Sequence, residues 1–270
     1  MPNKSLILAA LAFVLTAAAC GQSDSDRTAD TSAEQMDSAE DSVAAPSSSE
    51  RLAAVLAAQP ADVQARYRYR NPQETLEFFE VEPGMTIVEA LPGGGWYTKI
   101  LLAHVGSGGR LIGADYAQEM WPLFGFFTEE YIEAKKTWLD DFKRDAAEWA
   151  GDDGASASAF ILGSLPEEMH DTADRVLFIR ALHNLSRFEP DGGFLTAAIT
   201  DAYNVLKPGG IVGVVQHQAP DDKPAEWADG SRGYLHKSRV IELMKANGFE
   251  FVGEIGINHN HKDKPCLLYT

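Results

Sequence analysis

Residues 86–98 constrain the fold of this chain more than any other segment. They read as an apolar strand that runs into the consecutive glycines Gly93, Gly94 and Gly95 and then into a helix. A turn of this kind lets a ligand touch bare backbone. A second apolar run starts at Arg110 and ends on Asp115, whose carboxylate is suited to hold both hydroxyls of a ribose. Together the two segments predict a site for a nucleoside cofactor.

The glycine spacing leaves a simpler interpretation open. The three glycines are consecutive, so they do not match the G-x-G-x-x-G pattern of dinucleotide-binding turns. A tight connection between a strand and a helix, without a ligand, explains an isolated glycine triplet equally well. The order of the segments downstream favours the cofactor site.

The first 19 residues have the layout of a secretory signal peptide. An apolar run over residues 6–16 follows one lysine, and the small residues Ala17, Ala18 and Ala19 come next. The run is too short to cross a bilayer as a stable helix. Cys20 follows at once, so the site resembles a bacterial lipobox, and we expect Cys20 to be acylated. Cleavage by ordinary signal peptidase, which would release a soluble periplasmic protein, is the alternative.

Residues 20–50 read as a tether between this anchor and a globular body. They are rich in Ser, Asp, Glu and Ala and contain no aromatic residue, so they cannot bury enough apolar surface to offset the entropy of ordering. We therefore expect three parts: a signal peptide (1–19), a disordered tether (20–50) and one domain (51–270). The protein would be exported and held at the periplasmic face of a bacterial membrane.

Charge and cysteine content narrow the partners of the domain. Residues 51–270 contain 21 basic and 32 acidic residues, a net charge of −11, which disfavours nucleic acid and anionic lipid. A small molecule is the expected substrate, and membrane contact is expected only through the N-terminal anchor. Cys20 and Cys266 are the two cysteines of the sequence, so no internal disulfide can form once Cys20 is acylated.

The domain alternates between strand-like and helical patterns. Helical patterns are separated by glycine or proline signals such as those at 207–210 and 247–248. This alternation predicts a doubly wound, mostly parallel α/β sheet with helices on both faces. The predicted strands are 86–91, 110–116, 158–163, 174–181, 210–217 and 249–257, and the predicted helices are 96–104, 118–149, 191–206 and 236–247.

In such a sheet, ligands bind beyond the carboxyl ends of the strands, near the point where the strand order reverses. The ends of the first five predicted strands carry polar residues: Glu89, Asp115, Ser164, His183 with Asn184, and His217. Polar residues are also ordinary where strands emerge into solvent. The set as a whole predicts a binding site along one rim of the sheet.

Four blocks give this sequence a family resemblance. They are residues 66–79, 92–98, 180–184 and 206–217, and they are long and collinear. With them the chain resembles the class I S-adenosylmethionine-dependent methyltransferases, and more narrowly a family of predicted exported methyltransferases of undefined substrate. The resemblance covers nearly all of residues 51–264. It implies a Rossmann-like sheet and S-adenosylmethionine as the cofactor.

The resemblance also implies roles for the rim residues. Glu89 and Gly93 to Gly95 would lie along the methionine and ribose of the cofactor, and Asp115 would hold the ribose hydroxyls. Ser164 stands where many relatives place an aspartate at the adenine amine, which weakens that contact. Gln216 stands where the family more often has an acid beside the histidine at 217. The residues up to Thr270 are too few for the family's final antiparallel strand, so we expect that strand to be missing or the chain to be truncated.

Methyl transfer requires the two reactants to be positioned and, for many acceptors, a proton to be removed. His183 and His217 are the candidate bases, because a neutral imidazole near pH 7 suits this task without large tuning of its pKa, and Asn184 could orient the acceptor. Hydrogen-bonded histidines at strand ends, without a catalytic role, are the alternative.

The segment 118–149 carries aromatic residues at mostly three- and four-residue intervals. We interpret them as the stripe of an amphipathic helix or hairpin packed on the body. A lid over the acceptor pocket is the second interpretation, and Phe126, which falls off the stripe, would then contact the substrate.

Two other functions remain open. A metal site could draw on His183, His217, His259 and His261, although paired cysteines and a helical carboxylate-histidine motif are absent from the sequence. A cofactor-binding domain that has lost catalysis is the other alternative, because S-adenosylmethionine is made in the cytoplasm.

Overall fold

The computed structural model describes residues 46–259. The expected signal peptide, Cys20 and most of the expected tether lie outside the described residues, as do His261 and Cys266. Within residues 46–259, no helix is both long enough and apolar enough to pass through a bilayer.

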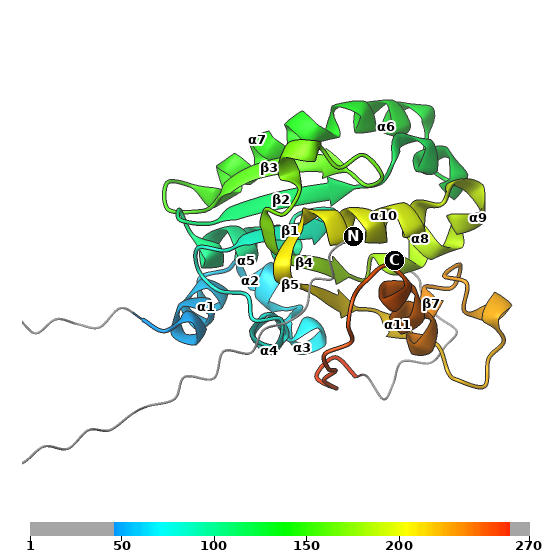
Figure 1. The fold of residues 1–270 in the computed structure, drawn as a ribbon. Coiled ribbons are helices and arrows are strands. Elements are labelled where there is room, and N and C mark those ends of the chain that lie inside the picture. The colour runs from blue at the N-terminus through cyan, green and yellow to red at the C-terminus, as the bar shows by residue number, and fades with distance from the viewer. Residues whose placement is uncertain (1–45, 260–270) are drawn as a thin grey trace, which may run out of the picture. The chain divides into compact units, whose positions relative to one another are not determined.

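The core of the described part is a sheet of five parallel strands in the order β3-β2-β1-β4-β5 (Figure 1). Val88 of the central strand is paired with Ile112 on one side and with Val176 on the other. The strand order reverses between β1 and β4, which confirms the predicted doubly wound α/β fold. The strands are β1 (Thr86–Ala90), β2 (Arg110–Asp115), β3 (Ser156–Ile161), β4 (Ala173–Ile179) and β5 (Leu206–Val215).

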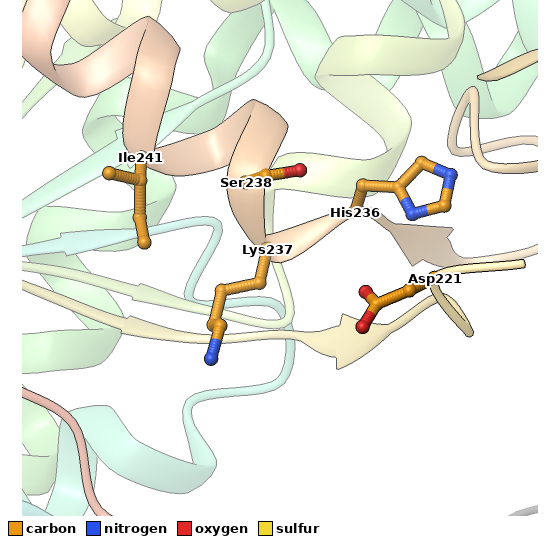
Figure 2. Close-up of a pocket in the computed structure, with 5 residues that line it drawn as sticks. All are labelled: Asp221, His236, Lys237, Ser238 and Ile241. Carbon is orange, nitrogen blue, oxygen red and sulfur yellow. The ribbon is translucent and has the colours of Figure 1, made fainter.

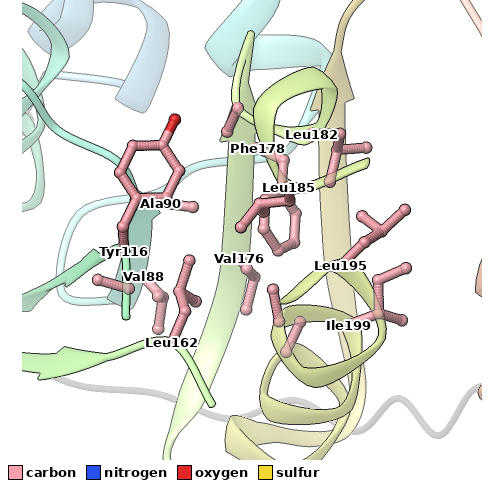
Figure 3. Packing of buried hydrophobic residues seen from close by; sticks show 14 of the residues in the cluster. Val88, Ala90, Tyr116, Leu162, Val176, Phe178, Leu182, Leu185, Leu195 and Ile199 are labelled. Carbon is pink, nitrogen blue, oxygen red and sulfur yellow. The ribbon is translucent and has the colours of Figure 1, made fainter. Parts of the chain in front are cut away.

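Both faces of the sheet are buried, because successive side chains of a strand point to opposite faces. Val88 and Phe178 belong to one apolar cluster, and Ile87 and Leu177 to the other. Figure 3 shows part of the first cluster, in which strand residues pack against leucines of two helices, α8 and α10. The second cluster packs the sheet against α1, α4, α5 and α7. Near-continuous apolar strands are typical of a parallel sheet covered on both sides.

The helices follow the strands in the order that a doubly wound sheet requires. In the described residues they are α1 (Ser48–Ala57), α2 (Ala61–Gln64), α3 (Tyr67–Arg70), α4 (Pro72–Phe78), α5 (Trp96–Val105), α6 (Glu129–Ala134), α7 (Trp138–Ala150), α8 (Leu182–Arg187), α9 (Glu189–Gly192), α10 (Phe194–Val205) and α11 (Lys237–Ala246). Four 3-10 segments accompany them: η1 (Gln118–Phe124), η2 (Lys135–Thr137), η3 (Glu167–Met169) and η4 (Ala225–Trp227).

The first helix begins earlier than the expected domain boundary at residue 51. Ser47 caps α1 by accepting a hydrogen bond from the Glu50 amide, and the Glu50 carboxylate accepts one from the Ser47 amide at 2.9 Å. This capping box fixes the first turn, and Leu52 then packs in the core at 1% exposure. Residues 48–50 therefore belong to the domain, and our assignment of them to the tether was wrong.

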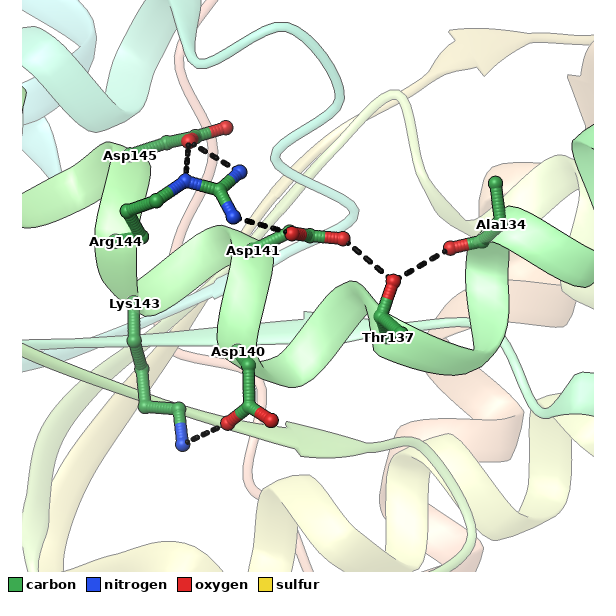
Figure 4. A network of polar contacts seen from close by, with 7 residues as sticks. All are labelled: Ala134, Thr137, Asp140, Asp141, Lys143, Arg144 and Asp145. Carbon is green, nitrogen blue, oxygen red and sulfur yellow. Dashed lines mark hydrogen bonds and ion pairs between the residues drawn. The ribbon is translucent and has the colours of Figure 1, made fainter.

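The aromatic segment after β2 is a series of short helices rather than one long one. Pro122 lies within η1 and Gly125 ends it in a left-handed conformation, after which Thr128 caps α6. Helix α7 closes the segment, and its outer surface carries ion pairs such as Lys143 with Asp140 (Figure 4). Pairs this exposed contribute little to stability. The aromatic residues still pack on the body, but they divide between its two apolar clusters, with Trp121 and Phe124 in the first and Trp138 and Phe142 in the second.

The predicted strand at 249–257 does not form. Residues 251–256 have no regular secondary structure, and Val252 is 89% exposed. The segment is instead held at its far end by amide side chains, because Asn71 Nδ2 donates to the Ile257 carbonyl at 2.8 Å and Asn258 Nδ2 donates to Thr75 Oγ1 at 3.0 Å. A second, two-stranded parallel sheet forms from β6 (His217–Gln218) and β7 (Tyr234–Leu235).

Candidate functional site

The glycine turn lies where the strand order reverses, between the carboxyl end of β1 and the start of α5. Its three glycines have different reasons to be glycine. Gly95 has φ of +76° and caps α5, and a Cβ there would collide with the indole of Trp149 on α7. Helix packing therefore explains Gly95 without a ligand.

Gly94 has no such explanation. A Cβ on Gly94 would meet no protein atom within 4 Å, and its φ lies outside the left-handed region. Gly93 has φ of +57°, and a Cβ there would come no nearer than 3.9 Å, to the Leu91 carbonyl. The backbone at Gly94 thus faces open space at the switch point, which is the location where open α/β sheets bind ligands.

Two non-glycine residues with strained backbones flank this turn. Leu91, directly after β1, has φ of +57°, and Arg180, directly after β4, has φ of +58°. Since β1 and β4 are neighbours in the sheet, both left-handed residues lie at the same edge. Residues held in this conformation cluster at functional sites more often than elsewhere.

Glu89 on β1 points its carboxylate at the first turn of α5. Thr98 Oγ1 donates a hydrogen bond to Glu89 Oε2 at 2.7 Å, and the residue is 6% exposed. Burial raises the pKa of Glu89 to about 7, against the opposing effects of the Thr98 hydrogen bonds and the charge of Arg70. A carboxyl group that changes charge near neutral pH is a frequent mark of a functional site.

Asp115 lies at the end of β2 and is buried at 5% exposure. Its Oδ1 accepts the amide N–H of Tyr116 at 2.9 Å, and its Oδ2 faces Lys135 Nζ at 3.3 Å. Burial raises the pKa of Asp115, and the charge of Lys135 lowers it in part. The ammonium of Lys135 also lies 4.4 Å from the ring centre of Trp121. The predicted ribose acid thus already has a cationic partner.

His183 and Asn184 follow β4 but lie in the first turn of α8, so our placement of them at a strand end was wrong. Asn184 Nδ2 donates to the hydroxyl of Tyr116 at 2.9 Å, which connects α8 to the residue after Asp115. Burial lowers the pKa of His183 to about 4, and the Gln216 side chain offsets this only in part. The imidazole is therefore strongly tuned, contrary to our expectation, and it is neutral at pH 7.

His217 also lies outside the strand in which we predicted it. It belongs to β6, and its ring centre is 5.5 Å from that of Tyr234 on β7. The preceding residue, Gln216, donates from Nε2 to the Gly233 carbonyl at 2.7 Å. Gly230 of the same loop packs on α8 so closely that a Cβ there would collide with the His183 carbonyl. The loop between β6 and β7 therefore connects the two candidate bases.

Ser164 lies in the turn after β3, is exposed, and donates its amide N–H to the Ile161 carbonyl at 2.9 Å. The amide of the adjacent Gly163 donates to the carboxylate of Asp201 at 2.6 Å. The turn is thus fixed by α10. Since β3 is the edge strand, Ser164 is two strands away from the glycine turn.

Some residues of this rim were not predicted from the sequence. They are Arg70, Thr98, Tyr116 and Lys135. The spacing of Thr98 from the glycines, one turn into the helix, is a signal that could have identified it. Lys135, in contrast, is four residues from Tyr131 on a stripe that we interpreted only as apolar.

The described residues show no arrangement of side chains that supports the metal hypothesis. Within residues 46–259, no group of three His, Cys, Asp or Glu side chains is arranged to hold an ion. His259 is exposed and lies in no strand. Phe126, the predicted lid contact, is 69% exposed and packs against Phe124 and Phe127.

A surface depression of about 530 Å³ lies near the start of α11, and none of its lining residues is predicted for the site (Figure 2). Two of its polar side chains already have partners, because His236 Nε2 is 3.0 Å from the Lys223 carbonyl and Lys237 pairs with Glu254 at 2.9 Å. The rim of the large sheet is the better candidate site, because buried titratable groups and open backbone meet there.

Known structures include several of similar shape. A SAM-dependent methyltransferase from Aquifex aeolicus has 17% sequence identity and a TM-score of 0.44, and the match covers 70% of this chain and 88% of that chain. An arsenic (III) S-adenosylmethionine methyltransferase from Chlamydomonas reinhardtii has 18% identity and a TM-score of 0.40, with 76% and 62% covered. A SAM-dependent methyltransferase from Geobacter sulfurreducens in complex with S-adenosyl-L-homocysteine has 15% identity and a TM-score of 0.39, with 67% and 65% covered. No protein-family model matches the sequence, and no curated protein matches it.

Proposed function

We propose that this protein is an S-adenosylmethionine-dependent methyltransferase that acts on a small molecule. The observation that carries the proposal is the open backbone at Gly94, at the switch point of the sheet, beside the buried carboxyl group of Asp115 on the next strand. Open backbone suits the close approach of a ligand, and a buried carboxylate suits a pair of hydroxyl groups. The net charge of the domain argues against a nucleic-acid substrate.

The residues present fit the cofactor in chemical type. Gly93 to Gly95 and Glu89 would lie along its methionine and ribose, Asp115 would accept hydrogen bonds from the ribose, and Ser164 would lie on the adenine side. When bound, the cofactor supplies a methyl group activated by a sulfonium, so the protein mainly positions the reactants. Lys135 must give up its contact with Asp115 for the ribose to bind there.

The candidate acceptor side is formed by His183, Asn184 and His217. His183 is neutral at pH 7 because its pKa is about 4, so it is able to accept a proton, although as a weak base. Asn184 uses one N–H of its amide nitrogen on Tyr116, so its second N–H and its amide oxygen are the groups that would orient an acceptor.

Calorimetry with S-adenosylhomocysteine tests the cofactor site. Gly94→Val should abolish binding, because the new side chain fills the space that the ligand needs, while its Cβ meets no protein atom within 4 Å. Gly253→Val is the matched control, since a Cβ at Gly253 also meets nothing within 4 Å. No heat with wild-type protein, or equal binding by both variants, would remove the assignment.

A non-catalytic domain that binds the same cofactor is the second candidate. The contact of Lys135 with Asp115 and the weak basicity of His183 favour it. The two candidates differ when protein is incubated with methyl-tritiated S-adenosylmethionine and a small-molecule extract of bacterial cells. Label transfer by wild type but not by Gly94→Val supports an enzyme, and binding without transfer supports the second candidate.

We also propose that the domain is held at the periplasmic face of a membrane through acylated Cys20, a residue outside those that the structure describes. The order of signal, small residues and cysteine in the sequence supports this. Cys20→Ser should change a membrane-bound protein into an unprocessed or soluble one, because the acyl chains supply the affinity. Recovery of wild type in the soluble periplasmic fraction would disprove the anchor.

A further inference from the structure

Arg70 is held over the glycine turn with its guanidinium group available. Its Cζ lies 4.5 Å from the ring centre of Trp96, the first residue of α5, and 5.8 Å from that of Tyr97. Its carbonyl accepts hydrogen bonds from the hydroxyls of Tyr97 and Thr75, each at 3.3 Å. Stacking on an indole fixes the plane of a guanidinium and leaves its edge free to donate.

Arg180 brings a second cation to the same edge from β4. Its amide N–H donates to the Val215 carbonyl at 2.7 Å, which sets it beside the end of β5 and next to Gln216. Burial is the main cause that lowers the pKa of Arg70 and of His183, and the charge of Arg180 lowers both further. Its backbone is strained, because Arg180 is not a glycine and yet has φ of +58°.

The described part of the chain, residues 46–259, places no carboxylate in an ion pair with either Arg70 or Arg180. Arg66 adds a further like charge that lowers the pKa of Arg70. Glu89 is the acidic neighbour of Arg70, and with a pKa of about 7 it is only partly ionised at neutral pH. Arg70 is half-buried, whereas Arg180 and Arg66 are exposed, and like charges gathered at one rim favour an anionic ligand.

One buried polar atom of the same rim also lacks a hydrogen-bond partner in the described part of the chain. It is Trp96 Nε1, the indole N–H of the residue on which Arg70 stacks. Buried polar atoms are normally bonded, so a donor left without a partner beside a cation indicates a missing acceptor.

We propose that Arg180 and Arg70 bind a carboxylate group of the methyl acceptor, with the Trp96 indole N–H as a further donor. The inference rests on the proposed function and names its substrate class as small organic acids. A fork of guanidinium donors matches the two oxygens of a carboxylate. Arg180 adjoins His183 rather than Asp115, so an acid bound there has its remaining atoms near the candidate base.

The test uses full-length protein, sodium acetate as the generic carboxylate, and acetamide as its neutral counterpart. Binding is followed by NMR on the Nε–H signals of the two arginines, assigned from the variants. With saturating S-adenosylhomocysteine present, acetate should shift both signals saturably, and acetamide should not. Arg180→Gln and Arg70→Gln should each weaken acetate about tenfold or more, whereas Arg239→Gln, at an exposed position on α11, should not.

A second arm separates the acceptor from the amino-acid end of the cofactor. 5′-Methylthioadenosine lacks that amino-acid end. If acetate binds with 5′-methylthioadenosine present but not with S-adenosylhomocysteine, the cofactor occupies the arginines and the inference is wrong. Acetate shifts that do not saturate, or that survive in the Arg70→Gln/Arg180→Gln double variant, also overturn it. Absence of S-adenosylhomocysteine binding by calorimetry is a separate result that removes the proposed function itself.

Discussion

Lys135 Nζ lies 3.3 Å from Asp115 Oδ2, and the two side chains are 19% and 8% exposed. The ammonium also lies over the rings of Trp121 and Tyr131, at 4.4 and 5.5 Å. The aromatic segment therefore holds the Lys135 ammonium beside the carboxyl group of Asp115, which the sequence predicts to bind the ribose hydroxyls. The segment is interpreted from its sequence either as a packed aromatic stripe or as a lid over the site. The two interpretations are compatible, because aromatic residues that pack on the body also hold the lysine that contacts the site.

Lys135→Met should destabilise the protein by about 1–3 kcal/mol at pH 8, because it leaves a buried carboxylate without its cation. The pKa of Asp115, already raised by burial, should rise further once Lys135 no longer lowers it. The loss of stability in Lys135→Met relative to wild type should therefore shrink as the pH falls and Asp115 is protonated. Urea unfolding at pH 5 and pH 8 measures both effects.

Lys136→Met is the control for this prediction. Lys136 pairs with Glu133, but their side chains are 57% and 70% exposed, so its loss should change stability by no more than about 0.5 kcal/mol. Equal losses in the two variants would mean that the Asp115 contact has no special stabilising role.

The sheet and the glycine turn could be predicted from the sequence because their signals are local. A strand such as β1 reads as a continuous apolar run, and the turn after it is marked by its own glycines. The predicted strand at 249–257 failed for the opposite reason. Its apolar residues promised a strand, but in the structure they pair with no strand, and side-chain amides of Asn71 and Asn258 hold the segment instead.

The chemistry of the rim depends on partners that are distant in the chain. Gly95 is required by Trp149, and Asp115 is paired with Lys135, yet neither pair has a fixed spacing that a sequence could reveal. His183 illustrates the same limit, because its low pKa comes from burial that only the packed fold creates. The position of a polar residue in the order of elements was predictable, whereas its protonation was not.

Glu89 and His183 should contribute opposite pH dependences to stability. The pKa of Glu89 is raised to about 7 from 4.5, so the folded protein binds more protons and stability falls as pH rises through this window. The pKa of His183 is lowered to about 4 from 6.5, so here the unfolded chain binds more protons and stability rises with pH. The two contributions nearly cancel between pH 4.5 and 6.5.

Replacing one of the two residues should therefore reveal the dependence of stability on pH that the other contributes. Glu89→Gln should leave stability rising with pH in this window, and His183→Asn should leave it falling, each by up to about 1.4 kcal/mol per pH unit relative to wild type. Gln at 89 keeps an acceptor for Thr98, so folding should persist. Urea unfolding at half-unit pH steps measures the slopes, and parallel curves for all three proteins would contradict both pKa shifts.

The final prediction separates the cofactor side of the rim from the acceptor side. Asp115→Asn should weaken S-adenosylhomocysteine about tenfold or more, because a carboxylate that accepts two ribose hydroxyls becomes a neutral amide. His183→Asn should change that affinity by less than about twofold, because His183 lies beside Arg180 and contacts the proposed acceptor rather than the cofactor. Calorimetry at pH 7.5 gives both affinities, and thermal unfolding confirms that each variant is folded. A loss at His183 as large as that at Asp115 would move the histidine to the cofactor side and leave the acceptor without its candidate base.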